Sequence, residues 1–246
     1  MNTPTWFEAW FNSPHYHLLY KGRDESEARG FIKRLTSKLG LPIGARVLDL
    51  ACGKGRHSVS LAELGFDVLG VDIAPDNITQ ARQLERSNLR FAIHDMRQVM
   101  KEPPFDAVLN LFTSFGYFEN AAEHQTAIHT MASAVKSNGV LVIDYLNVAQ
   151  VSRHLISDEQ LQVESVQFLI KRREDDTHFL KEIQVNDPSQ PVPHFYRERV
   201  AKFSLEDFTD MLAKENMKVR DVYGDYDLHV YDPSSSPRLV LIATRN

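Results

Sequence analysis

The stretch VLDLACGKGRHSVSLAELG, residues 47–65, decides the fold of this chain. It begins with a short apolar run of the kind found in strands that are buried on both faces. Gly53 and Gly55 follow, and residues 57–64 then have the composition of a helix. This order of strand, glycine turn and helix favours a ligand-binding site. The glycines let the backbone approach a ligand closely, and the N–H groups at the start of the helix can bind an anion. A plain tight turn has the same pattern, so the motif alone does not identify a ligand.

Strands and helices alternate along the chain up to about residue 150. Apolar side chains at helical spacing predict a helix over 24–39, and we expect further helices over 75–86 and 121–135. Further strands are predicted for FDVLGVDI (66–73), LRFAIHD (89–95), FDAVLNLF (105–112) and GVLVIDYLN (139–147). This alternation at short spacing indicates a parallel sheet with helices on both faces.

The pattern changes after residue 150. Three successive strands are predicted over 161–174, 177–186 and 194–204, with short turns between them, which favours an antiparallel sheet. A helix should then begin at Ser204, a good N-cap residue with Asp207 three positions later. Two last strands, over 218–226 and 238–245, would complete the main sheet.

The 246 residues suit one domain with an elaboration, so we interpret 1–246 as a single domain. Its parts are an N-terminal helical cap (1–40), a ligand-binding core (41–149), an antiparallel β insertion expected to cover the substrate (150–203) and a C-terminal helix with a β hairpin (204–246).

Composition narrows the possible partners. The chain has 28 basic and 33 acidic residues, a net charge of −5, so it lacks the overall basic charge typical of nucleic-acid or anionic-membrane binding. The single cysteine excludes an intrachain disulfide and fits a reducing compartment. The N-terminal segment lacks the pattern of a signal peptide, and no apolar run approaches the roughly 20 residues of a membrane span. We therefore expect a cytoplasmic protein with a small-molecule substrate and without nucleic-acid or membrane partners; the oligomeric state stays open.

Asp72 adds a second feature at a matched spacing. It ends the second predicted strand, 17 residues after Gly55. That spacing is close to the roughly 20-residue offset at which an acid accepts hydrogen bonds from ribose hydroxyls. The same residue could instead cap the helix that starts near residue 75. Together the two features favour an adenosine-containing cofactor, with nicotinamide dinucleotides and S-adenosylmethionine both possible at this point.

Residues 45–147 resemble the class I S-adenosylmethionine-dependent methyltransferases. The motifs that carry the resemblance are VLDLACGKG, VLGVDI, FAIHDM and FDAVLNLF. CGKGRHS and FTSFGYF are similar to a bacterial small-molecule subgroup with an N-terminal cap. The resemblance implies a Rossmann-like seven-stranded mixed sheet whose last strand is antiparallel, flanked by helices, with an N-terminal helical cap and an antiparallel β insertion. It also implies S-adenosylmethionine as the cofactor.

The resemblance implies a cofactor role for each matched position. Asp49 would orient the glycine loop, Asp72 would hold the ribose hydroxyls, and Asp95 would accept a hydrogen bond from the adenine amino group. Ile73 would pack on the adenine, and Met96 would supply a backbone contact. The methionine part of the cofactor would lie against Ala51, Cys52, Gly53, Asn110, Leu111 and Phe112. For Cys52, a buried lining role is favoured over nucleophilic catalysis, because a reactive thiol needs an activating base or a positive site.

Candidates outside the core follow from position. In the resembling families the N-terminal segment closes over the cofactor, which makes Tyr16, Tyr20 and Arg23 candidates for contacts with the methionine carboxylate and the sulfonium. A helix docked by its aromatic face is the alternative. Substrate contacts are predicted for Ser114, Phe115 and Tyr117 after the fourth strand, for Tyr196 and Arg199 in the insertion, and for the loop that carries Tyr226, His229 and Tyr231.

The predicted activity is in-line transfer of a methyl group from S-adenosylmethionine to a small molecule. The segment after the fourth strand lacks the Asp/Asn-Pro-Pro-aromatic signature, which argues against DNA adenine or protein glutamine as substrate. The catalytic residues are unknown, with His17, Tyr117 and His229 as weak candidates for a base and His15 beside them, and no metal site is predicted. The alternatives are a noncatalytic module that binds adenosylmethionine, a nicotinamide-dependent oxidoreductase and, only with a basic face, an RNA methyltransferase.

Overall fold

The computed structural model describes residues 5–22 and 25–245, and its contacts divide the chain into two compact units. The smaller unit combines residues 1–23 with 151–202. The larger unit combines 24–150 with 203–246. Helix α7 (Val148–Arg153) contains the sequence position at which the chain passes from the larger unit into the smaller one.

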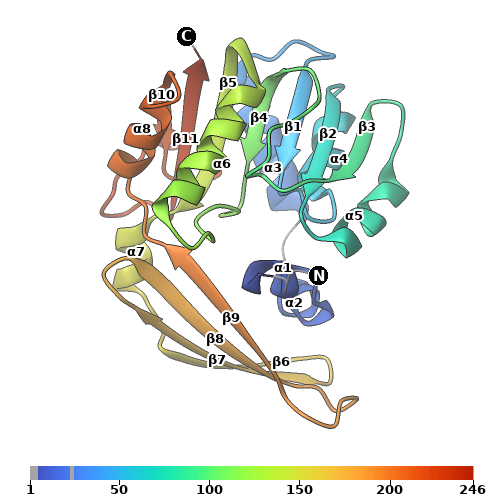
Figure 1. The fold of residues 1–246 in the computed structure, drawn as a ribbon, viewed down its shortest axis with the longest axis vertical. Helices are drawn as coiled ribbons and strands as arrows, with labels where there is room; N and C mark the ends of the chain where they lie inside the picture. The colour runs from blue at the N-terminus through green and yellow to red at the C-terminus, as the bar shows by residue number, and fades with distance from the viewer. Residues whose placement is uncertain (1–4, 23–24, 246) are drawn as a thin grey trace. The chain divides into compact units, whose positions relative to one another are not determined.

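The larger unit contains a seven-stranded sheet in the order β10-β11-β5-β4-β1-β2-β3 (Figure 1). Its strands are β1 (Arg46–Leu50), β2 (Asp67–Asp72), β3 (Leu89–Ile93), β4 (Phe105–Asn110), β5 (Val135–Leu146), β10 (Met217–Tyr223) and β11 (Arg238–Arg245). The first five pair in parallel, and β11 is antiparallel to both β5 and β10. The prediction of a seven-stranded mixed sheet with an antiparallel last strand is confirmed.

Helices cover both faces of this sheet, as the strand composition requires. On one face, α3 (Glu25–Leu39), α4 (Arg56–Glu63) and α5 (Pro75–Ala81) bury apolar residues with Val47, Val68, Ala107 and Val142. On the other face, Phe208 of α8 (Leu205–Ala213) packs against Tyr145 of β5, with ring centroids 5.1 Å apart, and α6 (Ala121–Ala134) contacts α8. A short 3₁₀ helix, η1 (Arg82–Leu84), follows α5.

The predicted start of α8 is confirmed in detail. The Ser204 hydroxyl accepts a hydrogen bond from the Asp207 amide at 3.1 Å, and the Asp207 carboxylate accepts one from the Ser204 amide at 2.7 Å. This reciprocal capping box satisfies two N–H groups that a helix start would otherwise leave without partners.

The smaller unit contains a four-stranded antiparallel sheet in the order β6-β7-β8-β9. The strands are β6 (Asp158–Val163), β7 (Val166–Glu174), β8 (His178–Asn186) and β9 (His194–Ala201). The prediction of three strands was wrong here. Residues 161–174 are not one strand, because Glu164 adopts a left-handed conformation with φ of 55° and reverses the chain, so that Val163 pairs with Val166.

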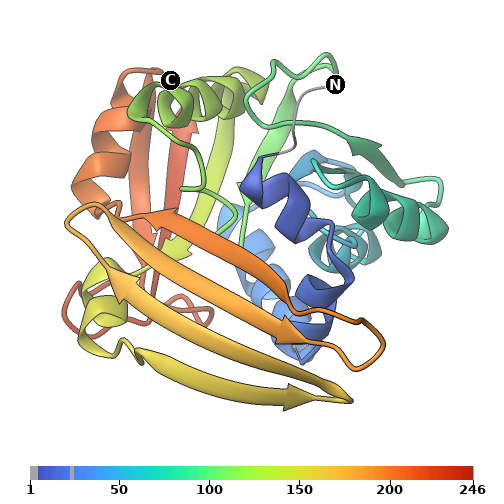
Figure 2. The ribbon, with the colours of Figure 1, turned by 60° about the horizontal axis from the view of Figure 1, so that its bottom comes forward.

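Two short helices, α1 (Trp6–Phe11) and α2 (Pro14–Leu19), belong to the same unit as this sheet, and α1 lies beside β9 (Figure 2). Trp10 is fully buried in a cluster with Phe168, Ile170 and Ile183 on one face of the sheet. The aromatic N-terminal segment therefore supplies the apolar cover that a sheet of this size needs on one face. No helix in the described ranges 5–22 and 25–245 is long and apolar enough to cross a membrane.

Candidate functional site

The candidate site lies in the larger unit, where the carboxyl ends of β1, β2 and β4 meet. The strand order reverses at β1, because β2 follows it on one side and β4 flanks it on the other. Ligands of doubly wound sheets bind at such a reversal point. The Cys52 amide donates to the Val71 carbonyl at 2.9 Å, and the Asn110 side chain donates to the Leu50 carbonyl at 3.1 Å. The structure therefore brings the three predicted segments together.

The glycine turn after β1 depends on left-handed backbone. Ala51, Gly53 and Gly55 have φ of 64°, 58° and 88°. A Cβ atom on Gly55 would lie 2.6 Å from the Phe91 ring, so any side chain there would require Phe91 to shift. At Gly53 nothing lies within 4 Å of where a Cβ would be, so backbone conformation alone favours glycine there.

Asp72 links the turn to the next helix. One carboxylate oxygen accepts the Gly53 amide at 2.8 Å, and the other accepts the Ala74 amide at 2.8 Å and the Asn77 side chain at 3.4 Å. Burial raises the pKa of Asp72, although these hydrogen bonds oppose the rise. The helix-capping alternative is not borne out, because the N-cap of α5 is Ala74 and no described side chain caps the helix; Asp72 bonds the Ala74 amide just before it. Each oxygen of a carboxylate has two lone pairs, so this role still leaves acceptor capacity for a ligand.

Asp49 is the second buried acid of the site. It is 1% exposed, and its carboxylate accepts a 2.5 Å hydrogen bond from the Ser58 hydroxyl of α4. Burial raises its pKa to about 6, with the hydrogen bond from Ser58 opposing the rise and Asp72 adding to it. Asp49 therefore ties β1 to the helix that follows the glycine turn.

Asn110, at the end of β4, has a buried acceptor without a partner. Its Nδ2 donates to Leu50, but among the residues that the structure describes no hydrogen-bond partner is found for its Oδ1. A buried polar atom without a partner costs free energy, so a ligand that donates a hydrogen bond here would be stabilised. Leu111, the next residue, is buried.

Phe112 and Thr113, two and three residues after the end of β4, both adopt left-handed conformations, with φ of 64° and 57°. The Phe112 ring has the Arg56 guanidinium 5.0 Å from its centroid, and the ring centroids of Tyr226 and His57 lie 6.3 and 6.5 Å away. Phe112 thus presents an aromatic surface beside cationic and aromatic neighbours at the end of β4.

An ion pair that the sequence analysis missed holds this segment. Asp144 of β5 is 1% exposed and accepts a hydrogen bond from Arg238 Nε of β11 at 2.8 Å, while Arg238 Nη2 lies 2.7 Å from the same carboxylate oxygen. It also accepts the Phe112 amide at 2.7 Å and the Tyr226 hydroxyl at 3.0 Å. The signal in the sequence was the acid inside the apolar run GVLVIDYLN, because a charge in a buried strand needs a partner.

Two of the predicted adenine contacts, Asp95 and Met96, follow β3, and the third, Ile73, directly follows β2. Asp95 is held by Arg97, whose Nη2 and Nε lie 2.7 and 3.1 Å from the carboxylate oxygen Oδ2. Partial burial raises the pKa of Asp95 and the hydrogen bonds from Arg97 lower it, with a net shift below its ordinary value. The Met96 carbonyl accepts from the Thr130 hydroxyl, and Ile73 is partly buried. Asp95 is therefore ionised and anchored.

The three predicted substrate residues after β4 have different surroundings: two bond to backbone carbonyls of their own turn, and the third is buried. The Ser114 hydroxyl donates to the Leu111 carbonyl at 2.8 Å, and the Tyr117 hydroxyl donates to the Thr113 carbonyl. Phe115 is fully buried, with ring centroids of Phe118, Phe203 and Phe208 within 6.2 Å of its own. Phe115 thus lies in the core, and the hydroxyl groups of Ser114 and Tyr117 stabilise the turn that follows β4.

In the smaller unit, Tyr16 and Tyr20 belong to the cluster around Trp10. The ring centroids of Tyr16 and Trp10 are 5.4 Å apart, and the Tyr20 hydroxyl donates to Glu198 at 2.9 Å and accepts from Lys181 at 2.5 Å. This is the arrangement that the docked-helix alternative predicted. Arg23 lies outside the described residues.

Tyr196 and Arg199 lie on opposite faces of β9, because residues three apart in a strand point to opposite sides. The Tyr196 hydroxyl is 2.9 Å from His15 Nδ1, and the other ring nitrogen of His15 is 3.3 Å from the Asp187 carboxylate. A guanidinium nitrogen of Arg199 is 3.2 Å from His178 Nδ1. One strand face cannot present both predicted residues to the same ligand.

The loop between β10 and β11 carries the remaining candidates. His229 is exposed and held by Asp225 at 2.7 Å; this hydrogen bond raises the pKa of His229. The Tyr231 hydroxyl donates to Asn147 at 3.4 Å. His17, the other candidate base, lies on α2 in the smaller unit, where its ring centroid is 5.4 Å from that of Tyr16.

Cys52 is buried beside the glycine turn. Burial and the neighbouring carboxylates of Asp49 and Asp72 raise the pKa of its thiol, which keeps the thiol protonated and a poor nucleophile. Among residues 5–22 and 25–245, no three His, Cys, Asp or Glu side chains form a group that could hold a metal ion.

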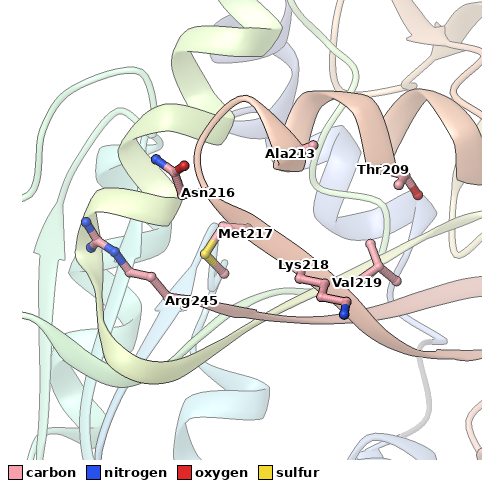
Figure 3. A pocket seen from close by; sticks show the side chains of 7 residues that line it. All are labelled: Thr209, Ala213, Asn216, Met217, Lys218, Val219 and Arg245. Carbon is pink, nitrogen blue, oxygen red and sulfur yellow. The ribbon is translucent and has the colours of Figure 1, made fainter.

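A pocket of about 770 Å³ lies elsewhere on the larger unit (Figure 3). Its lining includes Met217, Lys218 and Val219 at the start of β10, and Arg245 at the end of the antiparallel β11. Because Met217 pairs with Arg245 at the amino edge of the sheet, this pocket lies opposite the carboxyl edge and is separate from the candidate site.

Comparison with known proteins identifies the family. A family profile described as a methyltransferase domain matches residues 43–185. The chain belongs to this methyltransferase domain family. The match covers β1 to β5, including every segment of the candidate site up to Asp144, so the predicted family is confirmed.

Individual relatives agree with this assignment. The chain is 33% identical over 146 residues to a glycine/sarcosine N-methyltransferase of Aphanothece halophytica, covering 57% of this chain and 52% of that protein. It is 30% identical over 133 residues to a dTDP-3-amino-3,4,6-trideoxy-alpha-D-glucopyranose N,N-dimethyltransferase of Streptomyces venezuelae, covering 52% and 54%. The chain therefore matches about half the length of these relatives.

One solved structure matches nearly the whole fold. An S-adenosylmethionine-dependent methyltransferase from Clostridium acetobutylicum superposes with a TM-score of 0.80, covering 94% of this chain and 95% of that one. At 18% sequence identity, this similarity establishes the fold alone.

Proposed function

We propose that this protein transfers a methyl group from S-adenosylmethionine to a small molecule. The observation that carries the proposal is the hydrogen bond between Asp72 and the Gly53 amide at the point where the strand order reverses, in a methyltransferase-family domain. It places an acid at the end of β2 against a glycine turn at the end of β1, which is the arrangement that binds an adenosine-containing cofactor.

The charge of the site supports a cationic cofactor. Asp49 and Asp72 are both buried, and burial raises the pKa of both carboxylates. A cation near them lowers the free energy of the ionised forms, whereas the pyrophosphate of a nicotinamide dinucleotide would repel them. Asn110 Oδ1, buried without a partner, offers an acceptor to an ammonium group. The residues therefore suit the sulfonium and α-ammonium groups of S-adenosylmethionine.

We assign the cofactor contacts as the family resemblance implies. Asp72 would hold the ribose, while Ile73, Asp95 and Met96 would contact the adenine. The methionine part would lie along Ala51, Cys52, Gly53, Asn110, Leu111 and Phe112, with Asp49 fixing the turn through Ser58. Contacts from Tyr16, Tyr20, Arg23, Tyr196 and Arg199 stay predictions.

Methyl transfer from a sulfonium requires few catalytic groups from the protein. Once bound, the cofactor would supply a methyl group on a sulfonium whose leaving group needs no further activation. The chain's own residues then align the acceptor and exclude water, so rigid support of the site matters more than an acid or base. A base is needed only when the acceptor arrives protonated, and His17, Tyr117 and His229 remain the candidates.

We further propose that the acceptor atom is an amine nitrogen. The printed names of both relatives above describe N-methyltransferases, one for glycine and sarcosine and one for an amino sugar. We also propose a cytoplasmic location, because the chain has a single cysteine. We propose no nucleic-acid partner, because the net charge is −5.

The test is transfer of a labelled methyl group from S-adenosylmethionine to a panel of glycine, sarcosine, nucleotide-linked amino sugars and matched hydroxyl compounds. The proposal predicts labelled product with at least one amine. Calorimetric titrations with S-adenosylmethionine and with NAD run beside it. Binding without transfer to any compound would favour a noncatalytic binding module, and binding of NAD alone would overturn the proposal.

A further inference from the structure

The segment that follows β4 is held in an unfavourable conformation. Phe112 and Thr113 are adjacent, neither is glycine, and both have φ near 60°. A left-handed conformation costs free energy for L-residues, and a β-branched residue such as Thr113 is especially rare there. Such a conformation persists only where its surroundings hold it, and it occurs often at functional sites.

Asp144 supplies most of the restraint. Its carboxylate accepts the Phe112 amide at 2.7 Å, and its backbone carbonyl accepts the Thr113 amide at 2.9 Å. Arg238 adds a third contact, because its Nη2 donates to the Thr113 hydroxyl at 2.8 Å. Asp144 of β5 and Arg238 of β11 therefore both hydrogen-bond to the segment that contains the two left-handed residues.

Both oxygens of the buried Asp144 carboxylate have partners, whereas the Arg238 side chain is 20% exposed. Arg238 Nε donates to Asp144 Oδ1 at 2.8 Å, Arg238 Nη2 lies 2.7 Å from the same oxygen, and the Tyr226 hydroxyl donates to Oδ2 at 3.0 Å. Asp144 lies on β5 directly opposite Val240 of β11, and Arg238 is two residues before Val240 on the same side of that strand. Removing one member would leave the other charge buried without its partner.

We propose that Asp144 and Arg238 are positioning residues for methyl transfer, which hold Phe112 and Thr113 so that the segment after β4 keeps the shape required for turnover. This rests on the proposed function, because it assigns the segment from Phe112 to Tyr117 to the methyl-transfer site. Neither residue is proposed to touch the reacting atoms. Their effect on the rate passes through the backbone of Phe112 and Thr113.

The decisive variant is Asp144→Asn, which keeps the shape of the side chain and removes its charge. Hydrogen exchange of the amides of residues 112–117, measured in the free protein, should become at least tenfold faster. Turnover should fall at least tenfold, and by a larger factor than the affinity for S-adenosylmethionine, because Phe112 is also assigned as a cofactor contact. Asp106→Asn is the matched control: Asp106 also accepts a backbone amide and a cation, from Arg46 and Lys136, but at the opposite end of β4.

A rescue variant separates positioning from general stability. Asparagine adopts left-handed backbone far more readily than threonine, so Thr113→Asn added to Asp144→Asn should restore at least part of the exchange protection and turnover. If Asp144→Asn does not fold, Arg238→Lys is tested instead. Lysine keeps the positive charge, but its single ammonium group cannot donate to Asp144 and Thr113 with the geometry of the arginine guanidinium. Arg238→Lys should then show faster exchange and lower turnover.

The inference is overturned if the folded variant, Asp144→Asn or its replacement Arg238→Lys, matches Asp106→Asn in exchange and turnover, or if Thr113→Asn restores nothing. It is also overturned if cofactor affinity falls as much as turnover. Failure of the proposed function looks different. In that case the unaltered protein transfers no methyl group to any acceptor, whatever the exchange measurement shows.

Discussion

At the scale of single residues, the site is set by two acids that are buried before any cofactor binds. Asp49 and Asp72 both have raised pKa values because burial disfavours their charged forms. Each is opposed by hydrogen bonds, from Ser58 to Asp49 and from the Gly53 and Ala74 amides to Asp72. A cation bound beside the two carboxylates would lower the free energy of their ionised forms.

The pH dependence of stability should report Asp49. Its pKa rises from 3.8 to about 6 on folding, so its contribution to stability is fully present below pH 3.8 and is lost as the pH rises through 6. The loss is on the order of 3 kcal/mol, at 1.36 kcal/mol per pKa unit. Asp49→Asn lacks this loss, so its unfolding free energy relative to the unaltered protein should rise across this window.

Urea denaturation at a series of pH values between 3.5 and 7.5 measures the difference. Asp210→Asn, which alters an exposed carboxylate on α8, is the control and should give a difference that changes little with pH. A pH-independent difference for Asp49→Asn would contradict the assigned burial cost.

At the scale of elements, the turn between β1 and α4 shows two different demands on glycine. Gly53 and Gly55 both have positive φ, but only Gly55 lies against a side chain, the Phe91 ring of β3. Gly55 thus fixes how closely the turn approaches β3, whereas Gly53 only has to adopt its conformation.

The two glycines should therefore respond differently to alanine. Gly53→Ala should cost about 1–2 kcal/mol of unfolding free energy, the penalty of a left-handed L-residue. Gly55→Ala should cost roughly 2–5 kcal/mol, because overpacking against Phe91 adds ~1–3 kcal/mol. Chemical denaturation of the two variants checks this order. Equal losses would show that Phe91 moves aside freely.

In the smaller unit, a partly buried pair joins β8 to β9. Lys181 Nζ lies 3.4 Å from Glu198, and the Trp10 indole donates to the same carboxylate at 2.7 Å. Lys181→Met should cost about 1–3 kcal/mol, because Glu198 loses the cation beside it and keeps the hydrogen bonds from Trp10 and Tyr20. Adding Glu198→Gln should recover much of that loss. Denaturation curves of the single and double variants decide the point, and a double variant as unstable as the single one would contradict it.

At the scale of the whole molecule, local pattern predicted the larger sheet well. Buried strands and helices alternate there, which predicted a parallel sheet with helices on both faces, and the family resemblance supplied the seven strands and the antiparallel last one. The fourth strand of the smaller sheet was missed because Glu164 reverses the chain without glycine, proline or asparagine. The pair of Asp144 and Arg238 was missed because it joins residues 94 positions apart. The only turn signal at the first feature is Ser165, and the second feature has no characteristic sequence spacing.

The central claim is that the carboxyl edge of the seven-stranded sheet binds S-adenosylmethionine through Asp72. Calorimetric titration of the cofactor into the unaltered protein, Asp72→Ala and the exposed control Asp76→Ala tests it most directly. The unaltered protein and the control should bind one equivalent. Asp72→Ala, shown to be folded by circular dichroism, should bind at least about tenfold more weakly, a loss of ~1.5 kcal/mol or more for a hydrogen bond to a charged group. Absence of binding by the unaltered protein, or equal affinity in folded Asp72→Ala, would contradict the claim.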